Sequence, residues 1–106
     1  MSYQVACAAD LDPGTARAVT MTDSDGKERV IAIVCDVEGD WYAIDDACTH
    51  GDVSLSEGDV GDKCIECWAH GAEFNLETGE GTLPAVTPVR TYSLTIQDQS
   101  VLVDLD

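Results

Sequence analysis

The sequence predicts an all-β fold, an antiparallel β-sandwich or barrel, on three observations. Short stretches rich in β-branched and aromatic residues recur along the chain. Gly and Asp separate these stretches at close intervals, as in Asp25-Gly26 and Gly61-Asp62. No window of eleven residues carries the apolar stripe of an amphipathic helix. Many short strands with frequent turns are typical of an antiparallel sandwich or barrel.

Eight segments alternate or concentrate apolar residues in the way that strands do. In chain order they are Tyr3–Ala8, Ala16–Thr22, Arg29–Val37, Trp41–Asp45, Lys63–Glu66, Ala72–Asn75, Val89–Ile96 and Val101–Leu105. The short polar links Glu38–Asp40 and Gln97–Gln99 predict hairpin turns between neighbouring strands. A length of 106 residues fits one domain, spanning 1–106. The longest apolar run, Val30–Cys35, is far shorter than the roughly 20 residues of a membrane helix.

The charge balance excludes several classes of partner. The chain has 5 basic and 21 acidic residues, which gives a formal net charge of −16. Nucleic acid and anionic membrane surfaces are therefore excluded as partners, because both bind through Lys and Arg. A strongly acidic surface is suited to basic protein partners, or serves solubility alone. No GxGxxG or P-loop pattern is present, so nothing indicates a nucleotide site.

The N-terminus and the cysteine count indicate a cytoplasmic protein. The first residues, MSYQVACAADLD, contain no basic patch, no long apolar stretch and no cleavage site of a secretory signal. The chain has five cysteines, and an odd number without a signal fits a reducing compartment better than a disulfide scaffold.

The segment from Asp45 to Glu80 differs from the rest of the chain. Ten acids and one base, Lys63, give it a net charge of −9, and it holds both histidines and three of the five cysteines. We interpret it as a loop-rich insertion on a β scaffold, where functional sites tend to lie.

Two short Cys/His pairs in this segment indicate a metal site. The first pair is Cys48-Thr49-His50, and after sixteen residues the second is Cys67-Trp68-Ala69-His70. Zinc accepts two thiolates and two imidazoles in a tetrahedron, although zinc sites usually group like ligands together. Mixed pairs suit a binuclear cluster in which one iron takes both thiolates and the other takes both imidazoles. The residues alone leave both metals open and favour the second.

The segment CTHGDVSLSEGDVGDKCIECWAHGAEFNLETGEGTLPA resembles the Rieske [2Fe–2S] motif, C-x-H-x16-C-x-x-H. The HG after each pair, the LSEG between them and the later TG and LPA also match. The resemblance implies a Rieske-type antiparallel β-sandwich or barrel with a loop-rich cluster-binding subdomain at about 46–84. It implies one [2Fe–2S] cluster, with two cysteines on one iron and two histidines on the other. Carried to this chain, the metal ligands are Cys48, His50, Cys67 and His70, and further cofactor contacts are Gly51, Trp68, Gly71 and Pro84.

The resemblance also implies a function. Small soluble Rieske ferredoxins carry electrons from a ferredoxin reductase to a terminal non-haem iron oxygenase of a dioxygenase system, and are not enzymes themselves. The oxygenase would need a mononuclear iron site with two more histidines, which this chain lacks. We expect a monomer whose Asp45, Asp46 and Glu73 steer basic partner surfaces. The alternatives are a Rieske-like accessory subunit of a reductase such as nitrite reductase, a redox protein linked to iron–sulfur cluster assembly, and a zinc module.

Four positions distinguish the chain from quinol-oxidising Rieske proteins. Those proteins have a disulfide between the cluster loops and place Ser and Tyr as donors to the cluster, where this sequence has Val53, Ala69, Ala72 and Phe74. We therefore expect a low reduction potential within the family. Trp68 replaces a common proline, and it either packs over the cluster or is an ordinary core residue. Cys7, Cys35 and Cys64 are interpreted as small buried residues.

Overall fold

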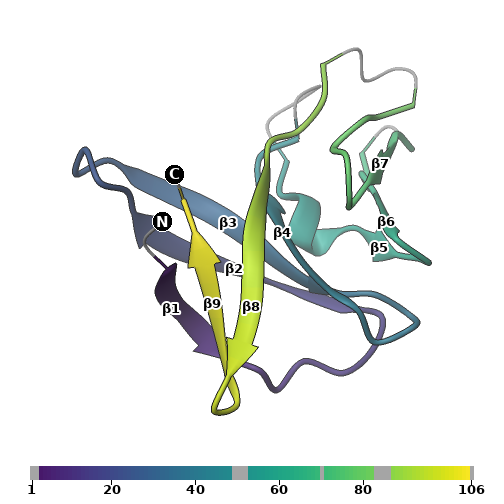
Figure 1. Cartoon of the computed structure of the whole chain (residues 1–106). Coiled ribbons are helices and arrows are strands. Elements are labelled where there is room, and N and C mark those ends of the chain that lie inside the picture. Colours follow the sequence, from purple (N-terminus) through teal and green to yellow (C-terminus); the bar gives the residue numbers. More distant parts are fainter. Residues whose placement is uncertain (1–2, 49–52, 70, 83–86, 106) are drawn as a thin grey trace.

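The computed structural model describes residues 3–48, 53–69, 71–82 and 87–105 (Figure 1). Across these residues the chain forms strands and one short 3₁₀ turn, and no helix among them is long and apolar enough to cross a membrane. The elements are β1 (Tyr3–Ala8), β2 (Thr15–Thr22), β3 (Glu28–Cys35), β4 (Trp41–Asp45), η1 (Leu55–Glu57), β5 (Asp59–Val60), β6 (Cys64–Glu66), β7 (Glu73–Asn75), β8 (Thr91–Gln97) and β9 (Ser100–Asp104).

The strands form two antiparallel sheets. The larger sheet has six strands in the order β1-β9-β8-β4-β3-β2, and the smaller has three in the order β5-β6-β7. The edge strands β1 and β2 lie side by side (Figure 1), and the Gln4 side-chain amide donates to the Thr22 carbonyl at 3.0 Å. The large sheet is therefore a nearly closed barrel, and the small sheet lies against its outer face. The predicted all-β antiparallel fold is confirmed.

Strand β3 is buried on both faces, which explains the long apolar run in the sequence. Ala32 and Val34 belong to the core between the barrel and the small sheet. Ile31 and Ile33, which alternate with them, belong to the core inside the barrel. A strand covered on both faces loses the apolar–polar alternation of a half-exposed strand. Thus β3 joins the two cores, and the small sheet packs on the outer face of the barrel.

All eight predicted strands are present, with bounds shifted by at most two residues. Two elements were missed, the two-residue β5 and the one-turn η1. Both predicted hairpin turns are confirmed. In the second, Asp98 and Gln99 both have positive φ, 51° and 64°, as a two-residue type I′ turn requires.

Asp36 ties the barrel to the small sheet. It follows β3 directly and is fully buried. One carboxylate oxygen accepts the backbone N–H groups of Glu38 and Asp40 at 3.0 and 2.9 Å, which shapes the β3–β4 turn. The other accepts the N–H of Lys63, 27 residues away and next to β6, at 3.1 Å. The buried carboxylate therefore holds one turn of each sheet.

Lys63 completes this connection. Its backbone is left-handed, with φ 57°, and its carbonyl accepts the N–H of Leu76 at 2.9 Å. Its ammonium group lies 3.1 Å from the Asp40 carboxylate and 3.4 Å from the Tyr42 hydroxyl. These partners raise its pKa above the ordinary lysine value, the Asp40 hydrogen bond most. The single base of the acidic segment thus bonds to the barrel.

We predict that Asp36→Asn lowers the free energy of unfolding by about 2–4 kcal/mol, because hydrogen bonds to a charged acceptor contribute roughly 1.5–3 kcal/mol each. An amide keeps the shape but presents an NH₂ group to backbone donors. Urea denaturation measures the change. The matched control is Asp62→Asn, which removes an exposed charge from the same loop and should change stability by less than about 0.5 kcal/mol. Equal stability of the Asp36 variant and the wild type would contradict this role.

Candidate metal centre

Two loops that begin with a cysteine are closed in the same way. In the first, the Cys48 N–H donates to the Val53 carbonyl at 3.0 Å, and Ala47 pairs with Ser54 just outside the loop. In the second, the Cys67 N–H donates to the Ala72 carbonyl at 2.7 Å. Glu66 pairs with Glu73 just outside that loop. Each loop therefore consists of six residues that connect two antiparallel paired segments, with its cysteine at the first position.

The two loops bring both cysteines into one apolar core. Cys48 is 5% exposed and Cys67 is fully buried. Both belong to the core between the barrel and the small sheet, together with Leu55, Phe74 and other apolar side chains. All five cysteines lie in the described part of the chain, and none forms a disulfide. Two thiols from separate loops, gathered in one core, are a donor set suited to a shared metal centre.

Asp46 anchors the first loop. It lies two residues before Cys48 and is 3% exposed. Its carboxylate accepts the Ser56 N–H at 2.9 Å, and its carbonyl accepts the Leu55 N–H at 2.6 Å. Its own N–H donates to the Val30 carbonyl at 3.0 Å. The bonds hold η1 against the end of β4. The expectation that Asp46 steers partners is therefore wrong, because the hydrogen-bonded carboxylate is inside the protein.

Asp45 fixes the same end of β4 to β8. Its carboxylate accepts the hydroxyl of Tyr92, and its N–H donates to the Arg90 carbonyl at 2.9 Å. The Arg90 guanidinium lies over the Tyr92 ring, 4.7 Å from the centroid. Burial and then the Asp45 hydrogen bond raise the pKa of Tyr92 to about 12. The carboxylate of Asp45 thus bonds within the fold.

Two glycines, Gly58 of the LSEG sequence and Gly79 of the later TG, allow close backbone packing. A Cβ on Gly58 would lie 1.9 Å from the Glu66 carbonyl oxygen. A Cβ on Gly79, whose φ is +82°, would lie 2.0 Å from the Val89 carbonyl oxygen. Only glycine fits at either place. Gly71 has φ +74°, a backbone conformation that favours glycine, and beyond its chain neighbours no atom of the described residues lies within 4 Å of the place of a Cβ.

The structure describes some of the predicted site residues and not others. Cys48 and Cys67 are described and lie in one core. The predicted ligands His50 and His70, and the predicted contacts Gly51 and Pro84, lie outside the described residues. The Trp68 side chain is 57% exposed, so the interpretation of Trp68 as an ordinary core residue is wrong.

Cys35 and Cys64 show no sign of a reactive role. Burial is the main cause that raises the pKa of both Cys35 and Cys64, and nearby carboxylates raise it further. A raised pKa disfavours the thiolate, which is the form that binds metals and attacks disulfides. Cys64 is therefore an ordinary strand residue and Cys67 a loop residue, and their C-x-x-C spacing does not indicate a redox motif.

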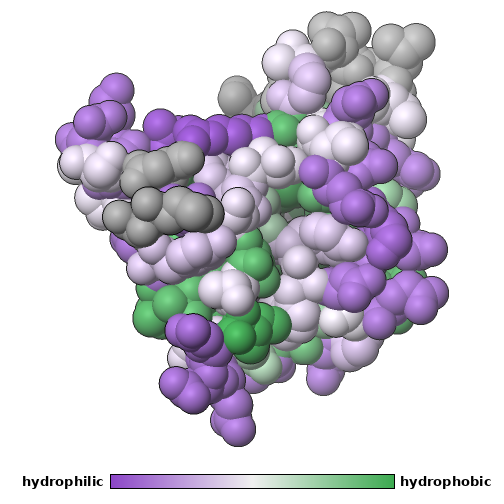
Figure 2. Space-filling model, viewed as in Figure 1, coloured by the Kyte–Doolittle hydropathy of each residue, from purple (hydrophilic) through white to green (hydrophobic). Residues whose placement is uncertain are grey.

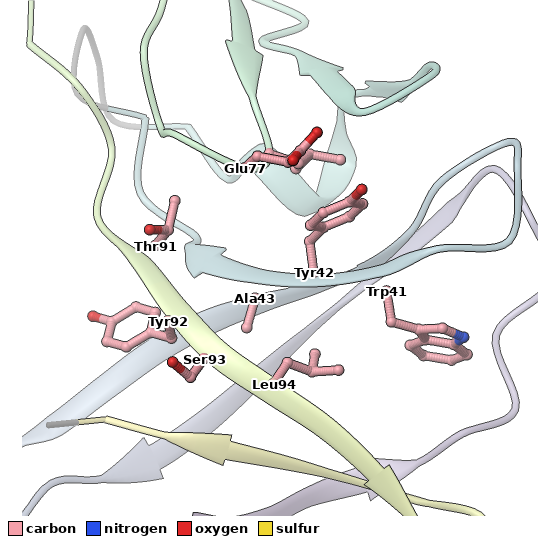
Figure 3. A pocket seen from close by; sticks show the side chains of 9 residues that line it. Trp41, Tyr42, Ala43, Glu77, Thr91, Tyr92, Ser93 and Leu94 are labelled. Atoms are coloured by element: carbon pink, nitrogen blue, oxygen red, sulfur yellow. The ribbon is translucent and has the colours of Figure 1, made fainter.

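A cavity of about 370 Å³ lies elsewhere, where β8 diverges from β4 (Figure 3). The ladder between these strands consists of two pairs, Ala43 with Tyr92 and Ile44 with Thr91. Beyond them the strands separate, and Figure 3 shows Tyr42, Glu77 and Leu94 around the opening. None of the lining residues is a predicted metal ligand.

Comparison with known proteins identifies the family. Residues 1–93 match the Rieske [2Fe-2S] domain. The chain belongs to this family. It is 36% identical to the ferredoxin component of biphenyl 2,3-dioxygenase from Rhodococcus jostii (strain RHA1), over 97% of this chain and 92% of that protein. The solved Sphingomonas yanoikuyae B1 ferredoxin has a TM-score of 0.86 at 30% identity, with coverage of 99% and 100%.

A third relative has been solved with a partner. A chain in the complex of reduced oxygenase and oxidised ferredoxin of carbazole 1,9a-dioxygenase is 35% identical, with a TM-score of 0.80 and coverage of 96% and 92%. The predicted Rieske-type [2Fe–2S] cofactor and Rieske-type fold are confirmed by the family and by these relatives. The buried pair Cys48 and Cys67 fits such a cluster, which takes two thiolates on one iron.

We predict that Tyr92 makes stability depend on pH above pH 10. The neutral hydroxyl donates to Asp45, and the pKa of about 12 in the folded protein exceeds the ordinary value of 10.0. A pKa raised by folding contributes stability that is complete below pH 10 and is lost as the pH rises towards 12. Tyr92→Phe should cost about 1–2 kcal/mol at pH 8.

Urea denaturation across this pH range measures the effect. The stability difference between the wild type and Tyr92→Phe should shrink above pH 10, where the unfolded tyrosine ionises first. Tyrosinate absorbance gives a second reading, because the ionisation step at the highest pH should be missing from the variant. A difference in stability that stays constant from pH 8 to 12 would contradict the assignment of this pKa to Tyr92.

Proposed function

We propose that this protein is a one-electron carrier, a Rieske ferredoxin that passes electrons from a reductase to a terminal non-haem iron oxygenase. The observation that supports it most is the pair of identically closed loops that bury Cys48 and Cys67 in one core. Relatives named as ferredoxin components of dioxygenase systems support this role. The protein itself is not an enzyme, as these relatives are carriers rather than catalysts.

We propose Cys48 and Cys67 as the ligands of one iron, and His50 and His70 as the ligands of the other. Residues at about 46–84 then form the cluster-binding subdomain of a single domain spanning 1–106. The bound cluster supplies one-electron oxidation and reduction. The chain supplies two buried thiols, loops that hold them in place, and an apolar core that keeps water from them. Gly51, Trp68, Gly71 and Pro84 are proposed as residues of the loops around the cluster.

The environment of the thiols favours a low potential. Ala72 and Phe74 are fully buried in the core that holds Cys48 and Cys67, and Val53 and Ala69 pack against it. None of these four side chains can donate a hydrogen bond. Donors to a cluster favour its reduced form, which has one more negative charge. Their replacement by apolar groups should therefore keep the potential in the lower part of the family range.

The charge and the sequence suggest how the carrier works in the cell. We propose a cytoplasmic monomer that binds basic surfaces of its reductase and oxygenase. A net charge of −16 keeps copies of the chain apart and steers basic partners towards it. Three acids were expected to steer partners, and Glu73 is the exposed one among them. Its carboxylate forms no hydrogen bond or ion pair with the described residues.

We predict that the purified protein contains two irons and two acid-labile sulfides per chain. The reduced form should give an electron paramagnetic resonance signal with the low average g value of mixed His/Cys ligation. Cys67→Ser should abolish the cluster, whereas Cys35→Ser should retain it, because Cys35 belongs to the barrel. Stoichiometric zinc without iron after anaerobic expression would contradict the proposal.

We predict that Phe74→Tyr raises the reduction potential by ~40 mV, which corresponds to a hydroxyl that favours the reduced state by about 1 kcal/mol. The wild-type value should lie near the low end of the range of about −150 to +300 mV known for Rieske centres. Voltammetry of the wild type, Phe74→Tyr and Ala72→Ser measures both. A wild-type value above about +100 mV would mean that other groups donate to the cluster.

A further inference from the structure

The loop that contains Cys67 presents an exposed tryptophan to solvent. Trp68 follows the buried Cys67 directly, yet its side chain is 57% exposed. The other large apolar side chains that are exposed in the described structure are Tyr3, Val5, Val30, Val37 and Ile96, all on the barrel strands or their turns. Tryptophan usually buries most of its area, and exposed aromatic residues are enriched where proteins bind one another.

Two carboxylates stand opposite each other at the base of the same loop. Glu66 on β6 and Glu73 on β7 are directly paired across the hairpin. Like charges at paired positions repel each other and weaken a hairpin. Neither residue takes part in any of the ion pairs of the described residues, and the Lys63 ammonium bonds to Asp40 instead. Within the described part of the chain, no cation is paired with either carboxylate to offset this repulsion.

We propose that Trp68 is the apolar anchor of the surface that binds the terminal oxygenase, and that Glu66 and Glu73 are its acidic rim. This inference rests on the proposed function. The partner surface should offer an apolar or arginine-bearing contact to the indole, surrounded by basic groups. Binding would bury the indole and bring a cation to the two carboxylates, so it relieves both unfavourable features of the free protein.

The position of Trp68 in the chain relates this surface to electron transfer. Trp68 is covalently attached to Cys67, which is in the core proposed to hold the cluster. A partner that packs on Trp68 therefore contacts the residue next to Cys67 in the chain. Figure 2 shows hydrophilic residues over much of the small sheet and an apolar area over the barrel strands β1 and β8. That apolar area contains no residue next to Cys48 or Cys67 in the chain.

The test uses the loaded protein and the oxygenase of carbazole 1,9a-dioxygenase as the probe. Stopped-flow mixing of the reduced protein with the oxidised oxygenase gives a limiting rate and a half-saturating concentration. Trp68→Ala should raise the half-saturating concentration at least tenfold. Trp68→Phe should recover most of the loss. The control Val5→Ala truncates the most exposed apolar side chain of the barrel and should change nothing.

Salt separates the two parts of the surface. The Glu66→Gln/Glu73→Gln double variant should associate more slowly at about 0.05 M salt, and like the wild type at about 0.5 M, because salt screens exposed charges. It should also be at least as stable as the wild type, since the repulsion is removed. The Trp68→Ala defect should persist at both salt concentrations, because apolar burial does not depend on screening.

The outcomes distinguish this inference from the function on which it rests. A wild-type protein with an intact cluster that fails to reduce the oxygenase overturns the proposed function. A wild type that reduces it, with Trp68→Ala reacting at the same half-saturating concentration, overturns the role of Trp68 alone. A Trp68→Ala variant with an altered visible spectrum or potential would show that the indole shields the cluster instead of binding a partner.

Discussion

The structure depends on carboxylates that are buried so that backbone N–H groups can bond to them. Asp36 accepts three such groups from two turns, and Asp46 holds η1 against β4. The cluster segment supplies Leu55, Ile65 and Phe74 to the core that it shares with the barrel. Charged acceptors form stronger hydrogen bonds than neutral ones, and here they add to that packing. In a chain of net charge −16, these two acids have structural roles that the charge count hides.

Strand β3 allows both halves of the molecule to share one scaffold. Its two faces line two different cores, so β3 packs against both the barrel interior and the core around Cys48 and Cys67. Each cysteine loop is six residues long and begins where an antiparallel pairing ends, a single bridge for the first loop and a three-pair ladder for the second. The barrel therefore positions the proposed ligands although it contributes none of them.

The sequence was sufficient for the longer strands, and it is the basis of the proposed ligands, because both leave a local pattern. Alternation and turn residues mark a strand of five or more residues, whereas β5 and η1 are too short to show any period. The ligands are marked by spacing. Nothing local distinguishes Asp46, which is buried, from Glu73, which is exposed, because burial follows from tertiary packing. The high exposure of Trp68 was missed for the same reason, since a tryptophan beside a buried cysteine suggests a core position.

Acidic residues act differently on partner binding and on the energy of the electron. Exposed carboxylates such as Glu73 are screened by water and salt within about 8–10 Å, so they steer partners but change the potential of a buried centre little. Buried ones act through a medium of lower dielectric constant and oppose the arrival of an electron more strongly. Asp46, two residues from Cys48 and 3% exposed, is placed to have the second effect. The hydrogen bond that its carboxylate accepts from the Ser56 N–H disperses part of its charge. Most acids thus lie at the surface, where they assist association. Asp36 and Asp46 are buried, and backbone N–H groups donate hydrogen bonds to their carboxylates.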